Sequence, residues 1–149
     1  QRQMCIRDRF KVVINLTRNH QDLEHAFRQM VFNILANNRD DHVKNFAFVM
    51  DRKGEWSLSP AYDLTFAPGP GGEHAMTVLG EGKAPAASDV EKLGEKHSIK
   101  GKTVTRIVDE VSEAVGRFRE FADMADVSRA SRKLIETKIE QNLKLFKRV

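Results

Sequence analysis

The stretch that decides the fold of this 149-residue chain is Asn38-Arg39-Asp40-Asp41-His42-Val43-Lys44-Asn45, and the pair Tyr62-Asp63 complements it. The stretch holds two adjacent carboxylates, and Asn45 stands five positions after the first of them. A further carboxylate, Asp63, follows Asn45 by eighteen residues. These groups can act together only if the chain between residues 45 and 63 turns back on itself.

A helix is predicted immediately ahead of this stretch, with Asp22 as its N-cap. Its apolar residues recur at intervals of three and four, as expected for one buried helix face: Leu23, Ala26, Phe27, Met30, Val31, Ile34 and Leu35. The polar pair Asn37-Asn38 then ends the helix and opens a loop. A buried helix that leads directly into an acidic loop can hold a catalytic carboxylate in place.

A β-hairpin is predicted directly after the stretch. Residues 45–50 and 56–58 are rich in aromatic and β-branched side chains, which is typical of short strands. Gly54 lies between them and is expected to take a positive φ in the turn. Because each strand needs only a few residues, the hairpin is expected to bring Asn45 and Asp63 close together.

The remainder of the chain predicts one long loop and further helices. Residues 67–87 are rich in glycine, proline and alanine and are expected to form a long mobile loop. Residues 88–91 match a capping box that opens a short helix ending near Glu95. Two more apolar stripes predict two longer helices: Val104, Ile107, Val108, Val111, Val115 and Phe118 for the first, and Leu134, Ile135, Ile139, Leu143 and Phe146 for the second.

Residues 1–9 resemble the translation of a transposase adapter used to build shotgun sequencing libraries, so we predict a non-native scar at 1–9 and a native domain over 10–149. The scar contains three arginines and one aspartate, so its removal lowers the formal net charge from +4 to +2. It also contains the single cysteine, which excludes disulfides and cysteine chemistry from the native part. The residual charge is too small to argue for nucleic acid. No segment resembles a signal peptide or a membrane span, so we expect a cytoplasmic protein that does not contact membranes.

The interval from Asp40 to Asn45 equals that of a protein-kinase catalytic loop, in which the Asp receives the proton of the attacking hydroxyl and the Asn holds magnesium. An adjacent Asp pair alone more often ends a helix, but Asp63 beyond the hairpin adds the second metal ligand that such enzymes need. His42 is interpreted as a loop residue that orients Asp40 rather than as the base. Lys44 has two open interpretations: it neutralises phosphate charge, or it pairs with Asp41.

The other histidines show no metal-site spacing and are expected to lie on the surface: His20, His25, His74 and His97. Trp56 and the phenylalanines are interpreted as core residues. Arg129, Arg132 and Lys133 are interpreted as a solvated helix face.

Residues 32–46 and 58–64, read together, resemble the C-terminal domain of HipA-type serine/threonine kinases, the toxins of bacterial toxin–antitoxin modules. The resemblance extends from about Phe10 through the helical tail. It implies a mostly α fold with a small β-hairpin, which is the helical C-terminal lobe of a protein-kinase-like HipA fold.

The resemblance also implies roles for five residues. Asp40 matches the catalytic base, Asn45 a magnesium ligand, and Asp63 the metal-binding aspartate. His42 and Lys44 match the remaining positions of the motif, with Lys44 also expected to contact ATP. The implied cofactor is magnesium, the implied substrates are ATP and a protein hydroxyl, and a HipB-like antitoxin is the implied partner. The same Asp-x-His-x-x-Asn pattern occurs in phosphoinositide-kinase-like enzymes, so the motif alone does not fix the acceptor.

The chain departs from the family pattern in one respect. No glycine-rich phosphate loop and no strand lysine precede Phe10, so we expect the N-terminal lobe to be missing and this polypeptide alone to be inactive. The alternative is a non-catalytic single-lobe module that docks an antitoxin or a substrate protein. A DNA-binding function is not favoured, because no basic recognition helix is present.

Overall fold

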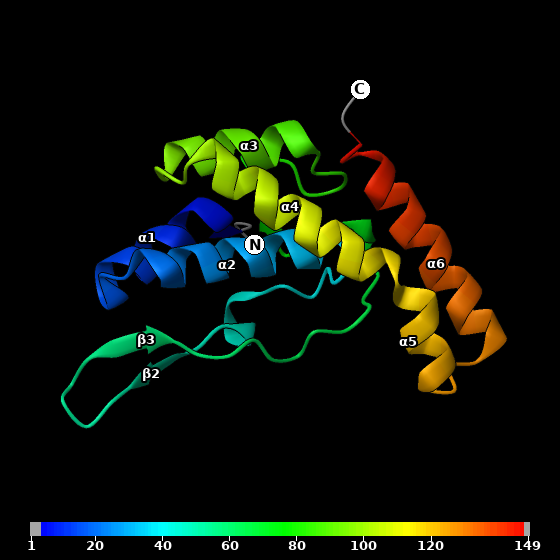
Figure 1. Ribbon diagram of the computed structural model, residues 1–149, viewed down its shortest axis with the longest axis horizontal. Coiled ribbons are helices and arrows are strands. Elements are labelled where there is room, and N and C mark those ends of the chain that lie inside the picture. The colour runs from blue at the N-terminus through cyan, green and yellow to red at the C-terminus, as the bar shows by residue number, and fades with distance from the viewer. Residues whose placement is uncertain (1–3, 148–149) are drawn as a thin grey trace.

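The computed structural model describes residues 4–147, and helices make up most of it (Figure 1). The helices are α1 (Ile6–Thr17), α2 (His20–Leu35), α3 (Ala87–Lys96), α4 (Gly101–Gly116), α5 (Phe118–Met124) and α6 (Arg129–Lys144). Helix α2 is central, because it packs against α1, α4 and α6. Helices α5 and α6 extend together at one end of the molecule. Within residues 4–147 no helix is both long and apolar enough to cross a membrane.

The predicted hairpin is confirmed. Strands β2 (Phe48–Met50) and β3 (Trp56–Leu58) pair antiparallel, with Phe48 opposite Leu58. Gly54 takes a φ of 83° in the turn, which suits a residue without a Cβ. The hairpin lies alongside α1 and α2 (Figure 1).

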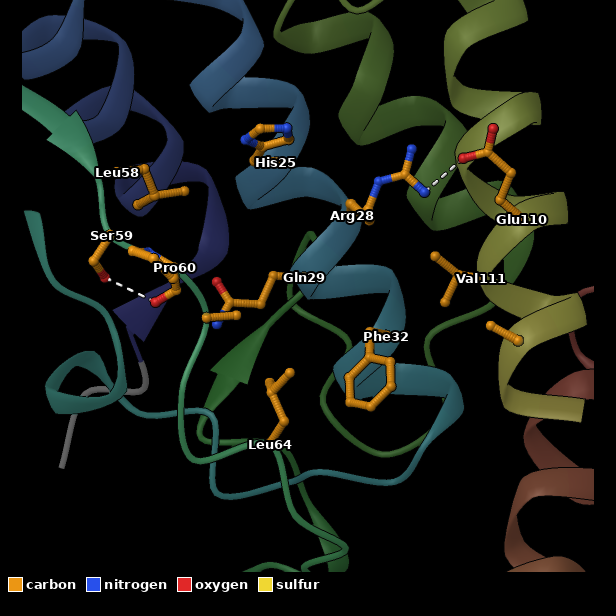
Figure 2. Close-up of a pocket in the computed structure, with 12 residues that line it drawn as sticks. His25, Arg28, Gln29, Phe32, Leu58, Ser59, Pro60, Leu64, Glu110 and Val111 are labelled. Carbon is orange, nitrogen blue, oxygen red and sulfur yellow. Dashed lines mark hydrogen bonds and ion pairs between the residues drawn. The ribbon is translucent and has the colours of Figure 1, made fainter. Parts of the chain in front are cut away.

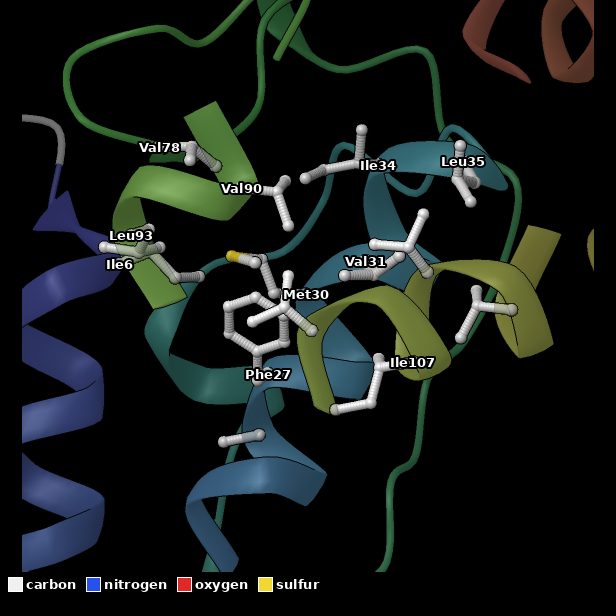
Figure 3. Close-up of a cluster of buried hydrophobic side chains, with 14 of the residues drawn as sticks. Ile6, Phe27, Met30, Val31, Ile34, Leu35, Val78, Val90, Leu93 and Ile107 are labelled. Atoms are coloured by element: carbon white, nitrogen blue, oxygen red, sulfur yellow. The ribbon is translucent and has the colours of Figure 1, made fainter. Parts of the chain in front are cut away.

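The hydrophobic core is built around the apolar face of α2, as the residue spacing predicts (Figure 3). Phe27 and Val31 are fully buried, and Ile107 of α4 faces them across the core. Val90 and Leu93 of α3 complete the same cluster. Burial of each such side chain contributes about 1.5–3 kcal/mol, so this cluster holds the helix that carries the acidic loop.

The N-terminus of α2 differs from the prediction. Its N-cap is Asn19, whose side-chain oxygen accepts the amide of Gln21 at 2.9 Å. Asp22 lies in the first turn and is buried, and its Oδ2 accepts the backbone amide of Leu58 at 3.1 Å. An aspartate near a helix start suits an N-cap by type, but here its carboxylate is used to anchor β3 to α2.

The predicted mobile loop over residues 67–87 is also wrong for its central part. Strand β4 (Met76–Thr77) pairs in parallel with β1 (Met4–Cys5). Met76 and Val78 are each 2% exposed and belong to the core. A glycine- and proline-rich composition excludes helix, but it does not exclude an ordered segment held by buried apolar residues.

Other expectations hold in part. Helix α3 begins at Ala87, one residue before the predicted capping box, and the Asp89 carboxylate accepts the amide of Ala86 at 3.0 Å. The apolar stripe of α6 is only partly buried, since Leu134 is 56% exposed. Trp56 is 40% exposed and is therefore not a core residue. Arg132 of the expected solvated face pairs with Asp123 of α5.

Residues 6–9 of the predicted scar form the first turn of α1, whereas residues 1–3 lie outside the described residues. Arg9 is buried, its guanidinium lies 3.3 Å from the centroid of the Phe46 ring, and its Nη2 donates to Gln29 at 2.6 Å. Burial lowers the pKa of Arg9 to about 9, against the opposing effect of Asp41. The non-native origin of residues 1–9 stays a prediction.

Candidate active site

The chain passes from the C-terminus of α2 into the acidic loop at Asn38, which contacts a second buried asparagine, Asn33 of α2. Asn38 Nδ2 donates to the side-chain oxygen of Asn33 at 3.1 Å and to the backbone carbonyl of Asp63 at 3.3 Å. Both asparagines are 2% exposed, so water does not compete for the bond between them, whereas Asp63 itself is exposed. Asn38 therefore fastens the backbone of Asp63 to the end of α2.

Two further residues, Tyr62 and Ala67, hold the segment around Asp63 against the acidic loop. Tyr62 Oη donates to the carbonyl of Lys44 at 2.8 Å. Ala67 accepts the amide of Arg39 at 3.1 Å and donates to the carbonyl of Asn37 at 3.0 Å. The expected approach of the two sequence elements is thus achieved by hydrogen bonds on both sides of Asp63.

Asp40 lies on the open side of the loop. Its side chain is 55% exposed, and its Oδ1 lies 3.5 Å from Nε2 of His42. Its backbone carbonyl accepts Nδ2 of Asn45 at 2.8 Å. Asn45 is the last residue of a single 3-10 turn, Val43–Asn45, so its side chain links the end of the loop back to Asp40.

Asp63 has an unusual backbone conformation. Its φ is 54°, in the left-handed region that non-glycine residues rarely adopt. Such a conformation costs on the order of 1–3 kcal/mol and persists where surrounding contacts enforce it. Here the bond from Asn38 to the Asp63 carbonyl is one such contact.

The donor set fits a hard divalent cation. Magnesium prefers oxygen ligands and commonly uses one or two protein carboxylates, with phosphates and waters completing its shell. Because Asn45 Nδ2 is bonded to Asp40, its Oδ1 is the atom that can coordinate a cation, and the exposed Asp63 carboxylate is the second donor. Among residues 4–147 no group of three or more His, Cys, Asp and Glu side chains could enclose a metal, so phosphate oxygens would have to contribute.

Asp41 pairs with a residue other than Lys44, which was the partner considered from the sequence. Its Oδ2 lies 3.1 Å from Nδ1 of His74, and its Oδ1 accepts the amide of Met76 at 3.2 Å. The pairing of Asp41 with Lys44 is therefore not formed; Lys44 is exposed. The expectation that His74 is a surface residue is wrong, since it is 3% exposed.

Two features of the site were missed by the sequence analysis. Asn33 is a polar residue on the apolar face of α2, and this break in the stripe was a usable signal. The Asp41–His74 pair had no such signal, because the two residues are separated by 33 positions without a recognisable spacing.

A pocket of about 410 Å³ lies between α2, α4 and the segment from Leu58 to Leu64 (Figure 2). Phe32 and Val111 line it, and an ion pair of 2.6 Å between Arg28 and Glu110 closes one edge. Asp40, Asn45 and Asp63 do not line this pocket. The candidate reactive groups therefore lie outside this pocket, and the Asp40 and Asp63 side chains are exposed.

Comparison with known proteins identifies relatives over most of the chain. The family model of the HipA-like C-terminal domain matches residues 1–119, a range that includes the predicted scar. The "Putative kinase Y4dM" of Sinorhizobium fredii is 28% identical over 109 residues, which make up 72% of this chain and 27% of that protein. In the complex of HipA, HipB and operator DNA from the toxin–antitoxin system of Shewanella oneidensis MR-1, one chain matches this structure with a TM-score of 0.76 at 16% identity.

That structural match covers 97% of this chain and 37% of the Shewanella chain. The present chain thus spans well under half the length of either relative. Its helices and single hairpin have the arrangement expected for the helical lobe of the HipA fold. Because the family model covers most of the chain and the fold agrees over nearly all of it, this chain belongs to the HipA-like C-terminal domain family.

Proposed function

We propose that this chain is the C-terminal lobe of a cytoplasmic, ATP- and magnesium-dependent serine/threonine protein kinase of the HipA type. One observation carries the proposal: buried Asn38 binds the backbone of Asp63 at the point where the acidic loop begins. This bond brings a carboxylate from beyond the hairpin to the loop that contains Asp40 and Asn45. A base and two oxygen ligands on adjoining segments are the parts that phosphoryl transfer requires.

In the proposed reaction, Asp40 accepts a hydrogen bond from a serine or threonine hydroxyl and takes its proton. The hydroxyl oxygen forms a bond to the γ-phosphorus of ATP while the bond from that phosphorus to the bridging oxygen breaks, and ADP leaves. His42, which lies 3.5 Å from Asp40, would keep the carboxylate in one orientation. The exposed Lys44 would offset phosphate charge.

Asn45 and Asp63 would hold magnesium, which offsets the negative charge on the phosphates when it is bound. The phosphate-covering loop and the strand lysine of a kinase would come from an N-terminal lobe, in line with the greater length of the relatives. We propose a HipB-like antitoxin as a partner, because the Shewanella structure contains HipA together with HipB.

The test begins with the source DNA upstream of the Phe10 codon. An in-frame phosphate loop and strand lysine there would define the complete enzyme, which is then assayed for transfer of the ATP γ-phosphate to protein. Asp40→Asn or Asp63→Asn should lower transfer by about 10²-fold or more while the circular dichroism spectrum is kept. Asp109→Asn, the same change at an exposed position on α4, is the control and should keep the rate.

Transfer at a near wild-type rate in either site variant contradicts the assignment. A genuine start codon close to Phe10 would instead indicate a single-lobe protein. Failure of that protein to bind ATP with magnesium in a calorimetric titration would then favour the docking module.

A further inference from the structure

Asp40 and Asp41 are neighbours in the sequence but lie in opposite environments. The Asp40 side chain is 55% exposed, whereas the Asp41 side chain is 5% exposed. Because they share one peptide bond, the contacts that hold Asp41 inside the protein also determine the direction in which Asp40 faces.

Both carboxylate oxygens of Asp41 are used inside the protein. Oδ1 accepts the Met76 amide at 3.2 Å, and Oδ2 lies 3.1 Å from Nδ1 of His74. A carboxylate oxygen at this distance accepts a hydrogen bond from the His74 tautomer that has its proton on Nδ1. His74 is itself fixed, since its backbone amide donates to the carbonyl of Gly82 at 2.8 Å. A buried pair satisfied in this way is rigid, and loss of one partner leaves the other uncompensated.

Further bonds connect this pair to the reactive groups. The amide of Ala75 donates to the carbonyl of Arg39 at 3.2 Å, so the segment after Asp63 is joined to the acidic loop on both sides of Asp40. Within the acidic loop, Asn45 Nδ2 donates to the carbonyl of Asp40. A shift of Asp41 would therefore move Asp40 and, through its carbonyl, Asn45.

We propose that Asp41 and His74 are positioning residues, whose buried pair turns Asp40 outward and sets the orientation of the Asn45 ligand. This inference rests on the proposed function, because it assigns the pair to the same phosphoryl-transfer site. It also means that residues 73–78, a segment that follows the metal-binding aspartate, help to set the orientation of the reactive groups.

The experiment compares variants of the 149-residue chain with Mn²⁺ as the probe. His74→Leu removes the donor, His74→Asn restores a donor near the place of Nδ1, and His74→Gln puts its amide near the place of Nε2. Ile139→Ala, in the buried face of α6, is the control for a general loss of stability. Mn²⁺ affinity is read from paramagnetic broadening of the Asn45 and Asp63 amide signals, and loop order from hydrogen exchange at the Arg39 and Asn45 amides.

His74→Leu and His74→Gln should weaken Mn²⁺ binding by about tenfold or more, while His74→Asn stays near the wild-type value. His74→Leu and His74→Gln should also speed amide exchange at Arg39 and Asn45 more than Ile139→Ala does. This comparison is made under conditions in which the variants have the same free energy of unfolding. If His74→Leu does not fold, the comparison of His74→Gln with His74→Asn decides. Wild-type affinity in His74→Gln, or an equal loss in Ile139→Ala, overturns the positioning role.

If the wild-type chain shows no broadening at Asn45 and Asp63, Mn²⁺ does not bind there without phosphate oxygens, and the positioning role is judged by amide exchange alone. Faster exchange at Arg39 and Asn45 in His74→Gln, restored in His74→Asn, supports the pair as the device that orders the loop. Unchanged exchange in His74→Gln overturns it.

Discussion

Single polar side chains in buried positions define the site at the residue scale. Asn38 joins the end of α2 to Asp63, and Asp41 joins the acidic loop to His74. Because Asn38, Asp41 and His74 are buried, loss of either bond would leave an unsatisfied buried group at a cost of about 1–3 kcal/mol. The exposed residues Asp40 and Asp63 depend on these buried neighbours for their placement.

His97 gives a residue-scale prediction on pH. Its ring meets Phe10 edge-on with centroids 5.3 Å apart, and burial lowers its pKa below the ordinary 6.5, with the charges of Lys11 and Arg7 acting in the same direction. Between the ordinary and the lowered pKa, the unfolded chain binds a proton that the folded chain does not. Stability should therefore fall as the pH drops through 6.5.

Urea unfolding between pH 7 and pH 5 measures this effect. His97→Phe keeps a ring against Phe10 without a titrating nitrogen, and His97→Gln removes both. Each variant should lose the part of the pH dependence that begins near 6.5, although their stabilities at pH 7 should differ. An unchanged profile in both would show that His97 does not contribute to it.

At the scale of elements, the contact between α3 and α4 depends on one glycine. A Cβ added at Gly94 would meet Cγ2 of Val104 at 2.6 Å, and the ring of Phe27 lies 3.6 Å away. Gly94→Ala gains about 1 kcal/mol of helix propensity but should lose about 1–3 kcal/mol through overpacking, so we expect net destabilisation.

The control for this prediction is Gly116→Ala near the end of α4, where an added Cβ meets nothing within 4 Å. That variant should keep or raise the free energy of unfolding in urea, by at most about 1 kcal/mol. Equal stability of the two variants would mean that α3 and α4 can separate slightly without cost.

At the scale of the whole molecule, one asparagine connects the C-terminal helix to the centre of the fold. Asn142 Nδ2 on α6 donates to the carbonyls of Ile34 at 2.9 Å and Leu35 at 3.3 Å in the last turn of α2, where the Ile34 carbonyl also accepts the amide of Asn37. Among the described residues of α6 only Ile139 is buried, so this polar contact matters for the docking of that helix.

Asn142→Leu should lower the free energy of unfolding by about 1–3 kcal/mol and speed limited proteolysis between α5 and α6. Gln141→Leu, at the adjacent exposed position, is the matched control and should leave both readouts close to wild type. Equal proteolysis rates in the two variants would show that apolar contacts alone hold α6.

The sequence by itself determined the elements whose cause is local. The intervals of three and four along residues 23–35 require a helix with one buried face, and aromatic and β-branched runs around Gly54 require a hairpin. The motif from Asp40 to Asn45 and the Tyr62-Asp63 element were sufficient to predict the family that the comparisons confirm.

Only the tertiary structure decided which distant groups meet. Asp41 meets His74 across 33 positions, β1 pairs with β4, and Asn142 reaches α2 across more than 100 positions. Such contacts leave no periodic pattern, because each depends on how whole elements pack rather than on neighbours in the chain. For the same reason an aspartate with the character of an N-cap became an anchor for β3, and a glycine-rich segment became an ordered support for the acidic loop.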